Sequence, residues 1–299
     1  MIILRRLWTP FYFGGYMRKL IIVPNDYKTI EKTKKEVDGF ILGIENLCTN
    51  ICYYINKNNI DLLNKLDDKE IFISINKNIN DNELDIVKEY LLLLNNYNIK
   101  GILVYDIGIF NIYKKMDLNY EIYWAQEHLT TNYASINYWN NEGFNGVYLS
   151  NDITNEELKE IIDNIDCKTI MTIFGYIPMF VSKRHIVDNY LDYFKLSDNS
   201  KINYIEKEDK IYPIVDNKIG TICFNSNILN GINTYIDLDL DYYVLDSFNI
   251  DIHKFIKVIE IFKKVNKSNI NKYEEKINNM FKHIDNGFLN TKTIYKVKK

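Results

Sequence analysis

Short apolar runs alternate with amphipathic segments along most of this chain, and this alternation is the feature that most restricts its fold. Each run has the length and apolar character of a buried strand, and the segment after it carries apolar residues at helical spacing. In the segment 81–97, for example, Leu84, Val87, Leu91 and Leu94 form one stripe. We expect eight strands, at Lys19–Val23, Gly39–Ile44, Ile71–Ile75, Gly101–Tyr105, Glu121–Ala125, Gly146–Leu149, Thr169–Ile173 and Tyr242–Leu245.

Eight such units predict an α/β protein with a TIM-like (β/α)8 barrel, because repeated βα units favour parallel strands joined by right-handed crossovers. An open doubly wound sheet is the alternative. Residues 186–235 interrupt the repeat with three short strand patterns, which predicts a small β-rich insertion above the barrel face. We therefore expect a barrel domain over residues 17–266 that includes this insertion, and a C-terminal helix with a basic tail over 267–299. Residues 1–16 are expected to be a leader outside the fold, or to precede a translation start at Met17.

Composition narrows the class of protein. The formal charge of −3 provides no general cationic field, which argues against a simple nucleic-acid coating protein. No apolar run reaches the about 20 residues of a membrane span. The abundance of Ile, Asn, Lys and Tyr matches a bacterial genome rich in A and T. Four scattered cysteines do not form a disulfide framework, so we expect a cytoplasmic protein.

The pair Cys48 and Cys52 has the spacing of one helical face. Two cysteines alone are a weak metal pattern, and small buried side chains are the favoured interpretation.

The stretch Phe174–His185 combines unusual residue types. Its Gly-Tyr-Ile-Pro sequence is expected to end the preceding strand, which places Lys183 and Arg184 just beyond a strand's carboxyl end. Ligands bind at that edge of α/β folds. The alternative is a surface loop with two solvated cations. Polar residues also follow other predicted strands, at Glu45, Asn76, Asp106, Gln126, His128 and Asp246.

Carboxylates, a histidine and a Lys-Arg pair at one barrel face could bind a small carboxylate or transfer a proton, although any solvated barrel mouth is polar. We take as catalytic candidates His128, His185, Glu45 and Asp106. We expect substrate to be bound by Asn76, Gln126, Asn132, Tyr176, Lys183, Arg184 and Asp246, with Tyr176 as a stacking surface and the two cations as an anion clamp.

Several separated motifs resemble the collagenase-like peptidase family U32. They are Glu127-His128-Leu129-Thr130-Thr131-Asn132 with Asn137-Tyr138-Trp139, the stretch from Phe174 to Tyr190, Tyr212-Pro213-Ile214, Gly220-Thr221, Asn225-Ser226 and Gly287-Phe288-Leu289 with Lys292-Thr293-Ile294-Tyr295. The chain is most similar to the short members that occur as one half of a pair in low-GC bacteria.

This resemblance implies a TIM-like barrel and two kinds of activity. Some members carry a peptidase or collagenase label, whereas others act in hydroxylation, including that of the tRNA wobble uridine with prephenate. The hydroxylation members hold an iron–sulfur cluster on four cysteines. Here His185 follows Arg184, and only Cys223 remains beyond Val181, so we expect no cluster, metal or other cofactor.

Three functions are compatible with these residues. The first is a tRNA-modification factor that binds a small carboxylate, and the second is a peptide hydrolase. The third is a non-catalytic partner of a longer, cysteine-bearing paralogue. The sequence contains no His-Glu-x-x-His or Gly-x-Ser-x-Gly motif, which disfavours a classical protease. We expect partners to include such a paralogue and tRNA, but no membrane.

Overall fold

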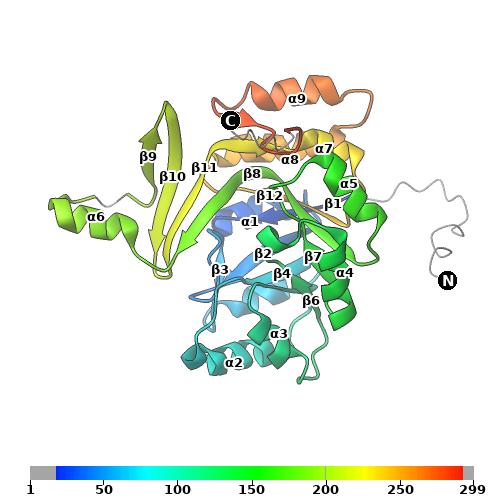
Figure 1. Cartoon of the computed structure of the whole chain (residues 1–299), viewed down its shortest axis with the longest axis vertical. Helices are drawn as coiled ribbons and strands as arrows, with labels where there is room; N and C mark the ends of the chain where they lie inside the picture. Colours follow the sequence, from blue (N-terminus) through cyan, green and yellow to red (C-terminus); the bar gives the residue numbers. More distant parts are fainter. Residues whose placement is uncertain (1–17, 199, 292–299) are drawn as a thin grey trace, which may run out of the picture.

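The computed structural model describes residues 18–198 and 200–291, so the expectations for residues 1–16 and for the tail beyond 291 lie outside the described residues. Eight parallel strands form a closed barrel (Figure 1). β12 pairs with β1 on one side and with β8 on the other, as in the register Tyr242↔Ile170. The predicted TIM-like barrel is confirmed, and the open sheet is wrong. The barrel strands are β1 (Lys19–Val23), β2 (Gly39–Ile44), β4 (Glu70–Ile75), β5 (Gly101–Val104), β6 (Glu121–Trp124), β7 (Gly146–Tyr148), β8 (Lys168–Ser182) and β12 (Tyr242–Asp246).

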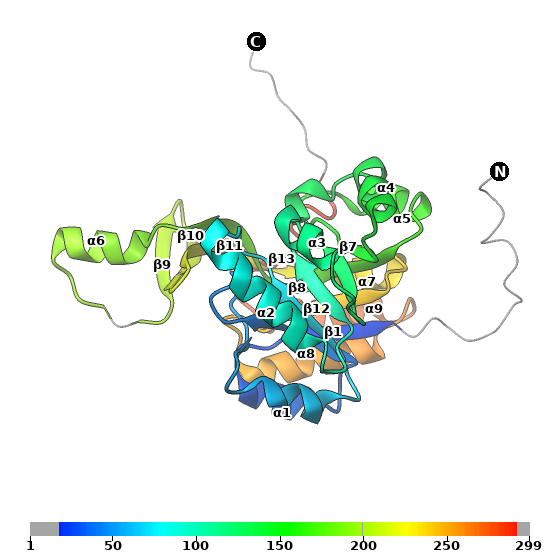
Figure 2. The same cartoon turned by 90° about the horizontal axis from the view of Figure 1, so that it is seen from below.

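Helical segments follow the strands and cover the outside of the barrel (Figure 2). Many of them begin at a side-chain cap, such as Asp26 on α1 or the capping box of Thr154 and Glu157 on α5. None of the helices in the described ranges is long and apolar enough to cross a membrane. The helices are α1 (Tyr27–Thr33), α2 (Leu84–Leu94), α3 (Ile107–Tyr113), α4 (Tyr133–Glu142), α5 (Asn155–Asp163), α6 (Ile186–Phe194), α7 (Ile232–Asp237), α8 (Ile252–Lys264) and α9 (Ile270–Asn278). Shorter elements are β3 (Tyr54–Ile55), β13 (Ile284–Asp285) and the 3₁₀ segments η1 (Ile60–Leu66), η2 (Asp81–Glu83) and η3 (Glu127–Leu129).

β8 is longer than the sequence predicts. Its first half pairs with β7 and β12 in the barrel, and its second half leaves the barrel and pairs antiparallel with β11 (Gly220–Asn230). The prediction that Gly-Tyr-Ile-Pro ends the strand is therefore wrong. Gly175 adopts φ = +127° where the strand changes partners, and Pro178 lies near an irregularity in the register, so these residues bend the strand without breaking it.

The second half of β8 forms the base of an arm that projects from the barrel, seen at the left of Figure 1. We define the arm as residues 176–224, in which β9 (Asn203–Lys207) and β10 (Lys210–Asn217) extend the sheet beyond β11 and α6 follows the end of β8. The short strands predicted for this region are present. Several large apolar side chains of the arm are exposed, among them Tyr193 at 80% and Tyr190 at 56%.

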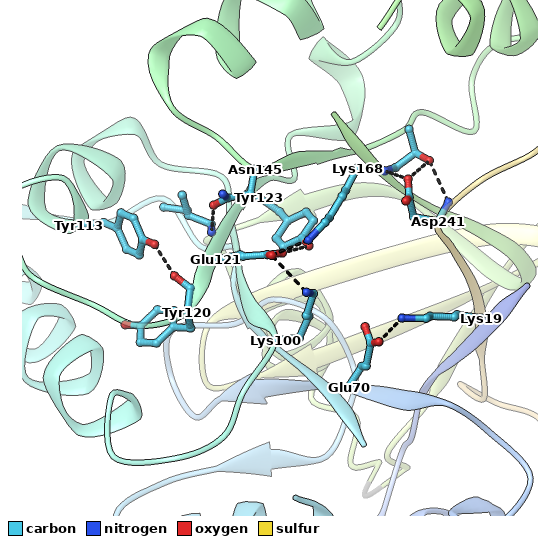
Figure 3. Close-up of polar contacts among 12 residues, drawn as sticks. Lys19, Glu70, Lys100, Tyr113, Tyr120, Glu121, Tyr123, Asn145, Lys168 and Asp241 are labelled. Carbon is cyan, nitrogen blue, oxygen red and sulfur yellow. Dashed lines mark hydrogen bonds and ion pairs between the residues drawn. The ribbon is translucent and has the colours of Figure 1, made fainter. Parts of the chain in front are cut away.

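Ion pairs and aromatic rings close the opposite, amino-terminal end of the barrel (Figure 3). Oε1 of Glu121 accepts hydrogen bonds from the ammonium groups of Lys100 at 3.1 Å and Lys168 at 2.5 Å. Burial alone would raise the pKa of Glu121, but bonds from Lys168, the Tyr123 hydroxyl and Lys100 hold it below its usual range. The ring of Phe72 packs edge-on against Tyr123 inside the barrel, with centroids 5.3 Å apart. These side chains fill the barrel interior at this end, and in TIM-like barrels ligands bind at the carboxyl ends of the strands.

Candidate functional site

A cavity of about 380 Å³ lies at the carboxyl ends of the barrel strands, and we call it the mouth cavity. Loops after the strands form its floor and one wall, and the arm covers it from the other side through β8 and β11. Its size suits a small organic molecule. The lining residues are Thr49, Asn50, Ile51, Asn76, Lys77, Asn78, Tyr105, Gln126, His128, Pro178, Met179, Phe180, Val181, Lys183, Ile219, Ile222, Phe224 and Asp246.

Asp246 ends β12 and provides a carboxyl group to the mouth cavity. Its Oδ1 accepts a hydrogen bond of 2.8 Å from the backbone N–H of Phe248. Burial raises the pKa of Asp246 to about 7, because the surrounding protein atoms disfavour the charged form more than this one N–H favours it. A carboxyl group with this pKa can either donate or accept a proton at neutral pH.

Two lysines place positive charge at the mouth cavity. Nζ of Lys183 donates a hydrogen bond of 3.1 Å to Oδ1 of Asn80, so the end of β8 reaches across to the loop after β4. Lys77 forms an ion pair with Glu83 and donates to the carbonyl of Asn46 at 3.3 Å. Lys183 is exposed and keeps two ammonium hydrogens for a ligand.

Arg184 and Tyr176 lie outside the lining of the mouth cavity. The backbone N–H of Arg184 donates to Oγ of Ser182 and its carbonyl accepts from Thr221, which fixes the turn after β8 while the side chain stays exposed. Tyr176 is half-buried, and its ring packs edge-on against Phe248 with centroids 6.1 Å apart. The structure therefore separates the expected clamp: Lys183 lies in the cavity and Arg184 beside it.

Amide side chains complete the polar lining. Asn76 is buried, and its Oδ1 accepts from the backbone N–H of Thr49 at 2.7 Å while its Nδ2 donates to Oδ1 of Asn50 at 2.8 Å. Asn76 thus holds the loop that presents Asn50 to the cavity. Gln126 lies on the same lining. Nδ1 of His128 is 3.1 Å from Oδ2 of Asp152, and the ring also borders a neighbouring cavity of about 230 Å³.

Three other predicted residues have structural contacts outside the cavity. Asp106 caps α3 through the N–H of Gly108 at 2.7 Å, and Asn132 caps α4 through Ser135 at 2.9 Å. Hydrogen bonds from Asn56 and then Lys218 hold the pKa of Glu45 below its usual range. Sequence reasoning missed Lys77, which directly follows Asn76, and Tyr105, which is the last residue of a predicted strand.

His185 precedes α6 and lies near Asp188 and Asp216, with ligand atoms within 4.8 Å of one another. This is the one group of three metal-type ligands in residues 18–198 and 200–291. Oδ2 of Asp216 already accepts the backbone N–H groups of Val187 and Asp188, so Asp216 caps α6.

The cysteines do not fit an iron–sulfur cluster. Cys167 immediately precedes β8 and Cys223 lies on the arm, at opposite ends of β8. Within residues 18–198 and 200–291, no three cysteines have their sulphur atoms within 4.8 Å of one another.

Comparisons with known proteins match the family that the motifs indicate. Residues 57–296, well over half of the chain, match the family model of peptidase family U32. The chain is 22% identical over 250 residues to tRNA hydroxylation protein P2 of Bacillus subtilis (strain 168), which covers 76% of this chain and 81% of that protein. It is 23% identical over 122 residues to tRNA hydroxylation protein P1 of the same organism, covering 41% of this chain and 29% of that protein.

Among solved structures, that of the U32 peptidase Mk0906 aligns with a TM-score of 0.46 and 11% identity, over 56% of this chain and 73% of that one. The family match extends from before η1 to beyond β13, and it includes the barrel strands from β4 onward and the arm. The chain belongs to peptidase family U32.

Proposed function

We propose that this protein acts in tRNA modification, in the hydroxylation of the wobble uridine, and that its mouth cavity binds a small carboxylate of the prephenate type. The relatives named as tRNA hydroxylation proteins support the reaction class. The observation that carries the ligand assignment is that Lys183 and Asp246 both line one cavity of about 380 Å³.

Lys183 provides the charge that attracts a carboxylate, and amides such as Asn50 donate hydrogen bonds to it. Asp246 is half protonated near neutral pH, because burial raises its pKa to about 7. In its neutral form it donates a hydrogen bond to a ligand oxygen without repelling the carboxylate. In its ionised form it accepts a proton from the ligand.

Arg184 supports contact with tRNA. Its side chain is exposed beside the mouth cavity, and it follows Lys183 at the end of β8. The net charge of −3 makes a local basic site necessary for phosphate contact. We propose that Arg184 binds a tRNA phosphate while Lys183 binds the small ligand.

A protein partner, in our proposal a longer and cysteine-bearing paralogue, fits the arm. Exposed aromatic side chains such as Tyr193, Tyr190 and Phe194 are costly in a lone protein and typical of interfaces. In this arrangement the paralogue holds the cofactor, and this chain supplies ligand binding.

Nucleoside mass spectrometry of tRNA from a deletion strain tests the function. Hydroxylated wobble uridine should be lost in the deletion and restored by the wild-type gene. Lys183→Ala should restore less than a tenth of it, whereas Lys32→Ala, an exposed lysine on α1, should restore it fully. Unchanged modification in the deletion strain would overturn the proposal.

Peptide hydrolysis is the alternative in the family's label, and it needs an activated nucleophile or a metal-bound water. The hydroxyl of Ser182 is 3.1 Å from the N–H of Arg184, whose hydrogen bond it accepts. His185 lies beside Asp188 and Asp216, and Asp216 caps α6. We expect purified protein to leave gelatin and casein intact, and cleavage that Asp246→Asn abolishes would favour the hydrolase.

A further inference from the structure

The loop between β2 and β3 has two different faces. Thr49, Asn50 and Ile51 line the mouth cavity. Cys48 and Cys52, at the two ends of the same segment, are 0% and 3% exposed and pack into the apolar interior of the barrel. The segment is not helical, so the expected helical face is wrong, although both side chains are buried. Two thiols therefore lie directly behind the wall of the mouth cavity.

The two sulphur atoms are close together. A Cβ atom built on Gly43 would lie 2.8 Å from each Sγ. The sulphurs can therefore be no further apart than twice that distance. Only glycine leaves room for both sulphurs at this position of β2. Cysteines separated by three residues in an irregular loop can form a disulfide with small backbone changes, because a loop can adjust its dihedral angles.

The polar surroundings favour reaction at Cys48. Burial alone would raise its pKa, but hydrogen bonds from Cys52, Ser74 and the backbone N–H of Asn50 lower it below the usual value. Ser74 pairs with Gly43 across β2 and β4, and its buried Oγ has no hydrogen-bond partner among the described residues, so it is free to donate to a thiolate formed beside Gly43. The pKa of Cys52 is raised, by the hydrogen bond to Cys48 and by burial. Such a pair has one nucleophilic and one resolving thiol.

We propose that Cys48 and Cys52 are a redox-active dithiol that a hydroperoxide converts into a disulfide behind the mouth cavity. The Cys48 thiolate attacks the peroxide, an S–O bond forms, the O–O bond breaks, and the departing alkoxide takes the thiol proton. The Cys52 sulphur then attacks the sulfenic acid, the S–S bond forms, and the hydroxyl leaves as water with the Cys52 proton. Both cysteines are oxidised, and the peroxide is reduced to an alcohol and water.

Full-length protein treated with cumene hydroperoxide tests the proposal. After quenching, free thiols are alkylated in denaturant, and the intact mass and digest are measured. We expect the disulfide to lower the protein mass by about 2 Da, and two of the four cysteines to be protected from alkylation. The digest should contain a Cys48–Cys52 cross-linked peptide, and dithiothreitol should reverse both changes fully. Persistence of four free thiols in folded protein, or oxidation of either cysteine without cross-linking, would overturn the proposal.

Cys167 is the internal control. It is more exposed than the pair, but burial raises its pKa to about 12, with Asp241 and Asp166 adding to the effect. If thiolate character and pairing control the reaction, Cys48 should oxidise at least tenfold faster than Cys167. If solvent exposure controlled the reaction instead, Cys167 would oxidise faster than Cys48, and this result would refute the assignment. Cys52→Ser, checked for folding by circular dichroism, should leave Cys48 as a sulfenic acid that dimedone traps.

Discussion

Replacing Asp246 with asparagine should stabilise the protein at alkaline pH, because it removes a carboxylate that the fold disfavours. Burial raises the pKa of Asp246 from an ordinary 3.8 to about 7. Each unit corresponds to about 1.4 kcal/mol, so ionising Asp246 in the folded state costs at most about 4 kcal/mol relative to the unfolded chain. Asp246 retains some surface in the mouth cavity, where water lowers this cost, and we expect about 2 kcal/mol.

The sign follows from the direction of the shift. A carboxyl group with a raised pKa in the folded state contributes its stability below the unfolded pKa, and that stability is lost as the pH rises through about 7. The amide introduced by Asp246→Asn keeps an oxygen that can accept the N–H of Phe248, and it carries no charge. The free energy of unfolding of Asp246→Asn should therefore match that of the wild type near pH 4 and exceed it by about 2 kcal/mol at pH 8.

Urea unfolding at half-unit steps from pH 4 to pH 8, followed by circular dichroism, measures this difference. The control is Asp239→Asn, which changes an exposed aspartate and should shift stability by less than about 0.5 kcal/mol at every pH. The reasoning about burial of Asp246 would be refuted if the two proteins differed equally in free energy of unfolding at pH 4 and pH 8, or if the variant were less stable than the wild type at pH 8.

Three further substitutions test other contacts. Glu121→Gln should lower the free energy of unfolding in urea by about 2 kcal/mol at pH 7, because two lysines lose their charged partner. This difference should vanish as the pH falls through the lowered pKa of Glu121, because the wild-type carboxylate is then protonated as well. Gly175→Ala should cost about 2–3 kcal/mol, because φ is +127° and the new Cβ would lie 2.7 Å from Cβ of Asp246; a neutral effect would show that the strand bends elsewhere. Asn76→Ala should cost about 1–3 kcal/mol and speed hydrogen exchange at the N–H of Thr49, whereas unchanged exchange would show that Asn76 does not hold that loop.

The barrel could be predicted because its strands and helices differ in hydrophobic period, and all eight strands are present near the expected positions. The strand-end rule also brought Asn76, Gln126, His128 and Asp246 to one cavity, which Lys183 reaches from the far end of the extended β8.

The same rule failed to separate ligand-facing residues from helix caps. The residue after a strand in a βα unit lies at the barrel mouth and also precedes the next helix, so Asp106 fits both a ligand-binding and a capping pattern. Its hydrogen bond to the N–H of Gly108 shows that it caps α3. Gly and Pro signals do not distinguish a strand that ends from one that bends, which is why β8 appeared short. The loop that carries Asn50 has no periodic pattern from which its position could be predicted. Its position depends on a contact with Asn76, which is distant in the sequence.

The length of β8 sets the distance between the barrel wall and the end of the arm strand. One uninterrupted strand begins in the barrel wall and ends at Ser182, and no linker separates the two halves. Each residue of a strand adds about 3.3 Å, so the number of residues between Gly175 and Lys183 sets how far the ammonium group reaches over the mouth. Removing two residues would preserve the alternation of the two faces and shorten this reach by about 7 Å. Family members that bind ligands of different length could therefore differ by an even number of residues in this one strand.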